Sequence, residues 1–340
     1  MPLVFRYAAR SDVGLVRSGN EDSGYASDTL LIVADGMGGH VAGEMASATV
    51  TAIIAGLPIA DSDDVLTQLA DAVDEAQLEM RHIIAERPDF QGMGTTVTAV
   101  CWQGDRASLA HVGDSRAYML RDGQLLRLTK DHTYVQTLVD AGQITEDEAA
   151  THRRRNLLIR AIDGVNTVEP DLSIREVHPG DRIMLCTDGL SGVLRDPEIH
   201  ELLARSDPPG AVTALVDAAI ERGAPDNVTC VVADVAEVAE APAVPRPVVV
   251  GAAAEPRTRS QLPGVDFPQD SHLEPSAAQE PAPQQPPTTF RRRRRRWPAV
   301  VTALVVLGAV LAGAWLWVGR QYYVGSDNGF VSVYQGIPQT

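Results

Sequence analysis

Two kinds of hydrophobic pattern alternate along the first 237 residues. Short apolar or alternating runs predict β-strands near 3–9, 29–35, 95–102, 106–112, 116–121, 125–128, 171–177, 181–187 and 228–235. Longer segments with helical spacing predict helices near 41–56, 63–86, 131–141, 145–151, 196–205 and 210–222. The strands are grouped and do not alternate regularly with helices. This order favours an α+β fold with helices packed outside antiparallel sheets over a doubly wound parallel sheet.

The pattern changes after residue 237. Residues 238–290 are rich in Pro, Ala, Gln and Glu, and this composition predicts a disordered linker. A polybasic run of six arginines, 291–296, precedes 22 uncharged residues at 298–319, long enough for one transmembrane helix in membrane lipid. Because positive charge stays on the cytoplasmic side, we expect the domain at 1–237 to be cytoplasmic at the cell membrane and residues 320–340 to form a short outer tail.

Charge narrows the class of partner. The first 238 residues carry 19 basic and 38 acidic side chains, which disfavours nucleic acid as a partner because its phosphates would be repelled. Three cysteines, Cys101, Cys186 and Cys230, lie in apolar runs without CxxC spacing. They are expected to be buried and unpaired, as in a reducing compartment.

Four aspartates stand where predicted buried strands meet polar turns. They are Asp35 in LLIVADGMGGH, Asp114 in LAHVGDSR, Asp188 in IMLCTDGLSG and Asp226 in RGAPDNVTC. Carboxylates gathered at the strand ends of one sheet system would suit hard divalent cations, which prefer oxygen ligands. The pattern therefore indicates metal-assisted chemistry on a phosphate.

The Asp-Gly pairs separate into two groups. Asp122-Gly123 lies between two strand patterns and Asp163-Gly164 follows none, so both are predicted to be ordinary turns. Asp35-Gly36 and Asp188-Gly189 follow fully apolar runs, and glycine at 36 would let its carbonyl approach an ion. The glycine-rich segment 36–44 does not match a nucleotide loop, because Val41 and Glu44 stand where a dinucleotide fingerprint and a P-loop need Gly and Lys.

Arg17 supplies a positive charge beside these carboxylates in the sequence RSGNED, with Glu21 and Asp22 close behind. A guanidinium holds phosphate oxygens in a bidentate fork. The plainer interpretation is a surface arginine. By the same reasoning His111 is a hydrogen-bonded core histidine, and His40 either lies near a metal or faces solvent.

Seven segments together resemble the metal-dependent PP2C-type Ser/Thr protein phosphatases. They occur in family order: RSGNED (17–22), VADGMGGHVAGE (33–44), GMGTTVTA (92–99), HVGDSRAY (111–118), LTKDHT (128–133), CTDGL (186–190) and PDNVT (225–229). The resemblance implies a four-layer α-β-β-α sandwich of two antiparallel sheets flanked by helices. The layout with linker and span further resembles the membrane-anchored actinobacterial phosphatases that oppose receptor-like Ser/Thr kinases.

The resemblance also assigns roles. Asp35 would bridge two Mn²⁺ or Mg²⁺ ions, with the Gly36 carbonyl on one of them, and Asp188 and Asp226 would complete the other ion's shell. Asp114 with Asp188 would hold a third metal. Glu21 and Asp22 would act through water, and residues 130–160 would form a mobile flap that meets the substrate.

The implied activity is hydrolysis of phosphoserine and phosphothreonine on proteins by a metal-bridged water, with Arg17 placing the phosphoryl group. Substrates would be phosphorylated proteins, among them membrane Ser/Thr kinases. Met37 stands where many eukaryotic members have a histidine that protonates the leaving group, so the acid is either water or His40. The alternative, an inactive phosphatase-fold adaptor, is disfavoured because Arg17 and all four aspartates are present.

Overall fold

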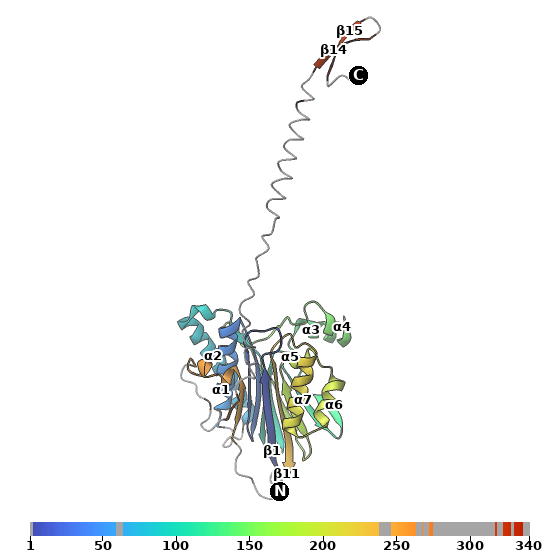
Figure 1. The fold of residues 1–340 in the computed structure, drawn as a ribbon. Coiled ribbons are helices and arrows are strands. Elements are labelled where there is room, and N and C mark those ends of the chain that lie inside the picture. Colours follow the sequence, from blue (N-terminus) through green and yellow to red (C-terminus); the bar gives the residue numbers. More distant parts are fainter. Residues whose placement is uncertain are drawn as a thin grey trace, which may run out of the picture. The chain divides into compact units, whose positions relative to one another are not determined.

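The computed structural model describes residues 3–58, 64–237, 246–262, 267, 272–274, 317, 322–327 and 330–335. The chain divides into two compact units, residues 1–280 and 281–340. The first unit is built around two sheets (Figure 1).

The smaller sheet has five antiparallel strands. Their order is β1 (Leu3–Asp12), β11 (Val228–Glu237), β10 (Arg182–Cys186), β7 (Arg116–Arg121) and β8 (Gln124–Arg127). The turn between β7 and β8 is the predicted Asp122-Gly123 hairpin, where both residues have positive φ, 51° and 75°. Positive φ at both central positions matches the right-handed twist of the flanking strands.

The larger sheet contains eight strands. Its order is β13 (His272–Glu274), β12 (Val248–Gly251), β2 (Asp22–Ala26), β3 (Leu30–Met37), β5 (Val97–Gln103), β6 (Arg106–Val112) and β9 (Asp171–Glu176), and β4 (Gly94–Thr95) pairs with β3. The pairs are antiparallel except for β12 with β13, which is parallel.

Strand β3 shows why the pattern LLIVA is apolar without interruption. Leu31 and Val33 pack into the core between the two sheets, whereas Leu30 and Ile32 pack into the core under the helices. Successive side chains of a strand point to opposite faces, so a strand covered on both faces needs apolar residues at every position.

Helices cover the outer face of each sheet (Figure 1). The outer core of the larger sheet includes α1 (His40–Ala55) and α2 (Val65–Glu86), with the short η2 (Pro88–Phe90) after them. The outer core of the smaller sheet includes α5 (Asp188–Ser191), α6 (Asp196–Ala204) and α7 (Pro208–Glu221). Two further helices, α3 (Tyr134–Asp140) and α4 (Glu146–Thr151), follow β8. The predicted α-β-β-α sandwich is confirmed.

The prediction of disorder for 238–290 is wrong for residues 246–262. Val248–Gly251 forms β12, Ala252–Ala254 forms η3, and Pro256–Arg259 forms α8. The composition of the whole stretch concealed a local Val-Val-Val run, and that run extends the sheet beyond β2, between β2 and β13. An open sheet edge presents unpaired backbone groups, which a further strand satisfies.

The polybasic run and the proposed span at 298–319 lie outside the described residues, apart from Trp317. Within the part of the chain that the structure describes, no helix is long and apolar enough to cross a bilayer. In the second unit, β14 (Tyr322–Asp327) and β15 (Phe330–Gln335) form an antiparallel hairpin that the hydrophobic pattern did not predict.

Candidate metal centre

Two of the predicted residues lie opposite each other on neighbouring strands. In the register of β2 and β3, Asp22 pairs directly with Asp35. Directly opposed residues in an antiparallel pair have Cβ atoms about 5 Å apart. Asp22 is 1% exposed, so its carboxylate is removed from water. Burying two like charges this close is unfavourable unless protons or cations neutralise them.

The smaller sheet brings two more aspartates to the same place. Asp188 begins α5 directly after β10, and Asp226 stands just before β11, which pairs with β10. A side-chain bond joins the two sheets here, since Thr187 Oγ1 donates to Asp22 Oδ2 at 2.8 Å. The backbone N–H of Thr229 in turn donates to Thr187 Oγ1 at 3.0 Å. The ends of the two sheets therefore converge on one acidic cluster.

The pKa shifts show that the carboxylates interact. Burial raises the pKa of Asp22 to about 8, with added repulsion from Asp188 and Asp226. Burial, and then the charges of Asp22, Asp188, Asp114 and Asp226, raises the pKa of Asp35 well above its usual value. The pKa values of Asp114 and Asp188 are likewise raised, first by burial and then by neighbouring aspartates. These five aspartates are called the acidic cluster below.

The donor set of the acidic cluster fits hard divalent cations. Oxygen donors are what Mn²⁺ and Mg²⁺ take in proteins. Asp188 Oδ1 is buried and has no hydrogen-bond partner among the described residues, and such an orphaned oxygen is a free ligand position. In the same described part of the chain, no three His, Cys, Asp or Glu side chains converge as a ready-made ion site. The case for metals therefore rests on donor chemistry and charge.

The backbone of Asp35 is held from the next strands. Its N–H donates to Thr96 Oγ1 at 3.0 Å, and its carbonyl accepts from Thr96 N at 2.9 Å and from Thr95 Oγ1 at 3.0 Å. Thr96 Oγ1 also bonds Ser115 Oγ at 2.8 Å, beside Asp114. One pair of threonines thus connects Asp35 with the loop that carries Asp114. The segment GTT, which alone reads as a turn and strand residues, has this additional function.

Glycine at 36 and 189 is required by close backbone packing. A Cβ on Gly36 would lie 2.2 Å from the Gly43 carbonyl oxygen and 2.4 Å from that of Glu21. A Cβ on Gly189 would lie 1.9 Å from the carbonyl oxygen of Asn227. Each glycine lets another segment of the site approach the strand end. That the Gly36 carbonyl also binds an ion stays a prediction.

Arg17 lies at the edge of the acidic cluster. Its Nη2 donates to Asp226 Oδ2 at 2.8 Å, and its Nη1 is 3.7 Å from Glu21 Oε1. The side chain is 46% exposed, whereas that of Glu21 is 7% exposed. The hydrogen bond to Asp226 raises the pKa of Arg17 above its usual value. The structure thus brings Arg17 to the carboxylates while leaving it open to solvent.

Asn227 holds the loop of residues 13–21, which carries Arg17, although the sequence analysis did not single it out. Its Nδ2 donates to the carbonyl oxygens of Val13 at 2.8 Å and Gly19 at 2.9 Å, and its Oδ1 accepts from Glu21 N at 2.8 Å. It stands beside Asp226 in the motif PDNVT, which was the available signal. The same holds for Thr187, which precedes Asp188 in CTDGL.

His111 is a core histidine, as its plainer interpretation held. It is 1% exposed, and its Nδ1 bonds Thr98 Oγ1 at 2.9 Å while its Nε2 bonds the Lys130 carbonyl at 3.1 Å. Burial, followed by the charge of His132, lowers the pKa of His111 to about 4. The histidine is therefore neutral at physiological pH. The side chain of His40 lies outside the described part of the structure.

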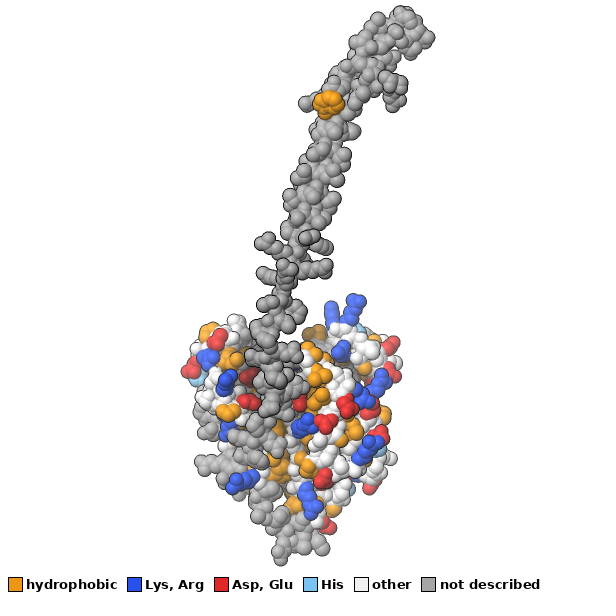
Figure 2. Space-filling model, in the orientation of Figure 1, with side chains coloured by type: hydrophobic (Ala, Val, Ile, Leu, Met, Phe, Trp, Pro, Cys, Tyr) orange, Lys and Arg blue, Asp and Glu red, His pale blue; other side chains and the backbone are white. Residues whose placement is uncertain are grey.

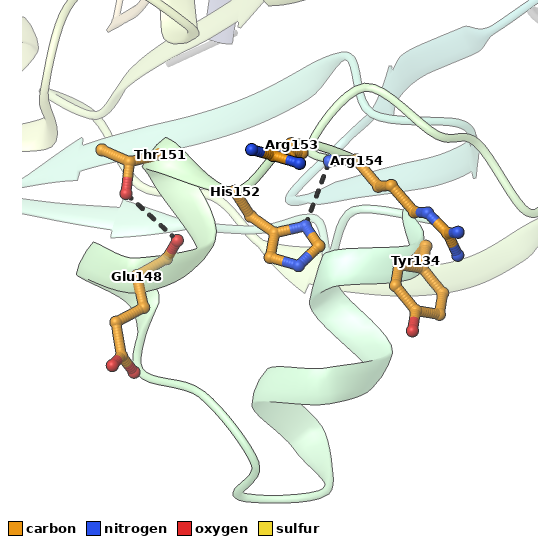
Figure 3. Close-up of a pocket in the computed structure, with 6 residues that line it drawn as sticks. All are labelled: Tyr134, Glu148, Thr151, His152, Arg153 and Arg154. Carbon is orange, nitrogen blue, oxygen red and sulfur yellow. Dashed lines mark hydrogen bonds between the residues drawn. The ribbon is translucent and has the colours of Figure 1, made fainter. Parts of the chain in front are cut away.

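The predicted flap carries a shallow pocket of about 520 Å³ (Figure 3). It is lined by side chains of α3 and α4 and of the segment after them: Tyr134, Glu148, Thr151, His152, Arg153 and Arg154. The Arg154 guanidinium lies 5.6 Å from the Tyr134 ring centroid, and Arg154 N donates to His152 Nδ1 at 3.1 Å. Figure 2 shows basic side chains projecting over the α3 and α4 end of the first unit. None of the acidic-cluster aspartates lines this pocket.

Known proteins match this arrangement. The sequence profile described as protein phosphatase 2C matches residues 20–227. Serine/threonine protein phosphatase PstP of Mycobacterium tuberculosis is 44% identical over 345 residues, covering 98% of this chain and 66% of that protein. This chain thus spans slightly less than two thirds of the length of PstP.

Solved structures agree with the sequence match. The crystal structure of the Mycobacterium tuberculosis serine/threonine phosphatase PstP has a TM-score of 0.66 and 49% identity, covering 69% of this chain and 100% of that one. A structure of the PstP catalytic domain in complex with two manganese ions has a TM-score of 0.65, with the same identity and coverage. With its two helix-flanked sheets and a profile match that includes Asp22, Asp35, Asp114, Asp188 and Asp226, the chain belongs to the protein phosphatase 2C family.

Proposed function

We propose that this protein is a metal-dependent phosphatase that hydrolyses phosphoserine and phosphothreonine on proteins. The observation that carries the proposal is the acidic cluster, in which five aspartates gather where the two sheets meet and burial raises the pKa values of Asp22, Asp35, Asp114 and Asp188. Relatives named as Ser/Thr protein phosphatases, and a PstP structure with two manganese ions, support the same reaction class.

The residues that would hold Mn²⁺ or Mg²⁺ follow from their places in the acidic cluster. Asp35 stands among the other four aspartates, which suits a bridging position between two ions, with Gly36 beside it. Asp188 and Asp226 would complete the shell of one ion, and Asp114 with Asp188 would hold a third. When bound, paired divalent cations lower the pKa of water and neutralise charge on a phosphoryl group.

The other residues bind and orient. Arg17, exposed at the edge of the cluster, would hold two phosphoryl oxygens and so fix the ester for in-line attack. Glu21 and Asp22 would act from behind the ligands through water. Thr187 and Asn227 hold those two residues in place through the bonds described above. Met37 has no proton to donate, so we assign protonation of the leaving group to solvent water.

The substrates and the location follow from chemistry and from sequence. A phosphatase of this family is expected to act on phosphorylated proteins, and we propose membrane Ser/Thr kinases and their substrates among them. The six arginines before the uncharged segment at 298–319 support a single-pass anchor in the cell membrane with the phosphatase domain in the cytoplasm.

The test is phosphate release by the full chain from a phosphothreonine peptide. We expect release with Mn²⁺, loss with a chelator and recovery when Mn²⁺ is restored, whereas Asp35→Asn with Mn²⁺ should release phosphate at least about 100-fold more slowly. Release that is indifferent to chelator would contradict the metal mechanism. Peptide binding without release by the unaltered protein would establish the alternative, an inactive adaptor.

A further inference from the structure

A strand from beyond the family-matched region lies against the strand that carries Asp22. The profile match ends at residue 227, yet β12 pairs with β2 from Val248 opposite Ala26 to Gly251 opposite Ser23. Asp22 follows as the next residue of β2 toward the acidic cluster. The register therefore delivers this later segment to the back of the metal centre.

The two strands are fitted to each other. A Cβ on Gly24 would lie 2.8 Å from Val250 Cγ2 and 3.1 Å from Thr229 Cγ2, so glycine at 24 makes room for the valine. Val250 is 1% exposed in the core between the sheets, and Val249 is fully buried in the core under the helices. The strand thus contributes one side chain to each core. A linker that only touched the surface of the domain would not bury side chains in both cores.

The chain then turns directly on the backbone of Asp22. Gly251 has φ 73°, and a Cβ there would lie 2.2 Å from the Asp22 carbonyl oxygen and 3.1 Å from Ser11 Oγ. Only glycine meets both demands, the positive φ and the close approach. The following Ala252, Ala253 and Ala254 are fully buried, and the last two belong to the same core as α1.

A buried chain of hydrogen bonds, called the relay below, runs from Ala253 to the backbone carbonyl of Glu21, the residue before Asp22. Ala253 N–H donates to Ser23 Oγ at 3.1 Å, Ser23 Oγ and Ser47 Oγ are 2.8 Å apart, and Ser47 Oγ donates to the Glu21 carbonyl at 2.6 Å. Because Ser47 gives its proton to Glu21, Ser23 must donate to Ser47, and all donors point the same way. Such chains strengthen each bond by polarisation. The Glu21 carbonyl also accepts from Gly36 N at 3.2 Å.

We propose that residues 246–262 are a positioning element of the metal centre. Docking of β12 and the relay through Ser23 and Ser47 fix Glu21, Asp22 and Gly36, so affinity for the metal ions depends on a segment after the phosphatase profile. This inference rests on the proposed metal-dependent function. Its test therefore measures metal binding and strand docking, not turnover.

The experiment compares full-length variants by titration calorimetry with Mn²⁺ and by amide hydrogen exchange of β2. Val250→Asp places a carboxylate between the sheets and should undock β12, exposing the β2 amides and weakening Mn²⁺ binding about tenfold or more. Its control, Ser260→Asp, adds the same charge at an exposed position of the same segment and should change the Kd less than about twofold.

A second pair isolates the relay and does not depend on the first variant folding. Ser23→Ala removes the central hydroxyl while leaving β12 docked, and the Kd for Mn²⁺ should rise about fivefold, as expected for one buried hydrogen bond. Thr49→Val is its control, because it removes a buried hydroxyl whose hydrogen-bond partner among the described residues, Met45 O at 2.7 Å, lies within α1 itself. The β2 amides should stay protected in both.

The outcomes separate the two proposals. If Val250→Asp and Ser23→Ala bind Mn²⁺ as the unaltered protein does, even with a lowered Tm, the segment is only a structural brace and the inference is overturned. If the unaltered protein itself binds no Mn²⁺, the proposed function fails, and the inference fails with it. Weakened binding in both variants, with normal binding in both controls, supports a positioning role.

Discussion

Without metal, the folded protein must hold the buried carboxylates of the acidic cluster close together, which lowers its stability. The substitution Asp22→Asn tests this effect. Asp22 is 1% exposed and lies opposite Asp35, and burial raises its pKa from 3.8 to about 8. The substitution keeps the shape of the side chain and an oxygen that can accept the proton of Thr187, but removes the charge. In chelator, the variant should be more stable than the unaltered protein.

The size of the effect follows from proton linkage. Above pH 3.8 the unfolded chain has released the Asp22 proton, whereas the folded chain keeps it until about pH 8. The folded state therefore binds more protons, and the free energy of unfolding falls as the pH rises across this window. The raised pKa of Asp22 therefore lowers the free energy of unfolding by about 4 kcal/mol at pH 7 and by about 1 kcal/mol at pH 4.5.

Urea unfolding in chelator at the two pH values measures this difference. We expect Asp22→Asn to gain about 2 to 4 kcal/mol at pH 7 and about 1 kcal/mol or less at pH 4.5. Asp105→Asn is the control, because that side chain is 77% exposed and should show no such gain. Added Mn²⁺ should reverse the order at pH 7 by stabilising the unaltered protein. Equal stability of the two proteins at pH 7, or a gain that does not depend on pH, would refute the reasoning.

Three other substitutions test separate parts of the site. With Mn²⁺, Asp35→Asn should lower phosphate release from a phosphothreonine peptide at least about 100-fold, whereas Asp114→Ala should retain more activity because it affects only the proposed third ion. Arg17→Ala should raise KM about tenfold and change the Tm by about 2 °C or less, because the side chain is 46% exposed; a large Tm loss in a thermal scan would make it structural. Gly36→Ala should lower the free energy of urea unfolding by about 3 kcal/mol, because its Cβ would lie 2.2 Å from the Gly43 carbonyl oxygen. Gly39→Ala should lower it by only about 1 kcal/mol, because no atom lies within 4 Å of a Cβ there. Equal losses would contradict the role of close packing at Gly36.

Much of the fold could be predicted because its central strands are buried on both faces. The run at Leu30–Ala34 is apolar at every position, and that alone marked Asp35 as the end of a central strand. Asp122 does not follow a fully apolar run, and its φ of 51° places it in an ordinary turn. The structure of these residues is determined by local turns and by the period of apolar positions, so it can be predicted from the sequence.

Strands β2 and β12 were missed for a physical reason. Apart from Tyr25, the β2 residues Asp22–Ala26 are small or polar, and at Gly24 another segment occupies the space that a side chain would fill, since Val250 lies against it. Val248–Gly251 is extended because β2 offers it an edge, in a stretch whose average composition is typical of disorder. Pairing between strands this far apart in the chain produces no periodic pattern in either segment, so neither strand could be predicted from the sequence. Thr187 and Asn227 were missed likewise, since their roles appear only when the two sheets meet.

The pairing of β1 with β11 has a consequence for how the protein is made. Leu3 lies opposite Glu237, so β1 gains this partner only after the roughly 230 residues between them, almost the whole phosphatase domain, have been synthesised. At about 5 to 20 residues per second that interval is about 10 to 50 seconds. Arg17 and the Asp22 strand follow β1 directly, and Asp226 stands just before β11. A nascent chain therefore cannot assemble the acidic cluster early, and we expect an incomplete polypeptide to lack the proposed phosphatase activity.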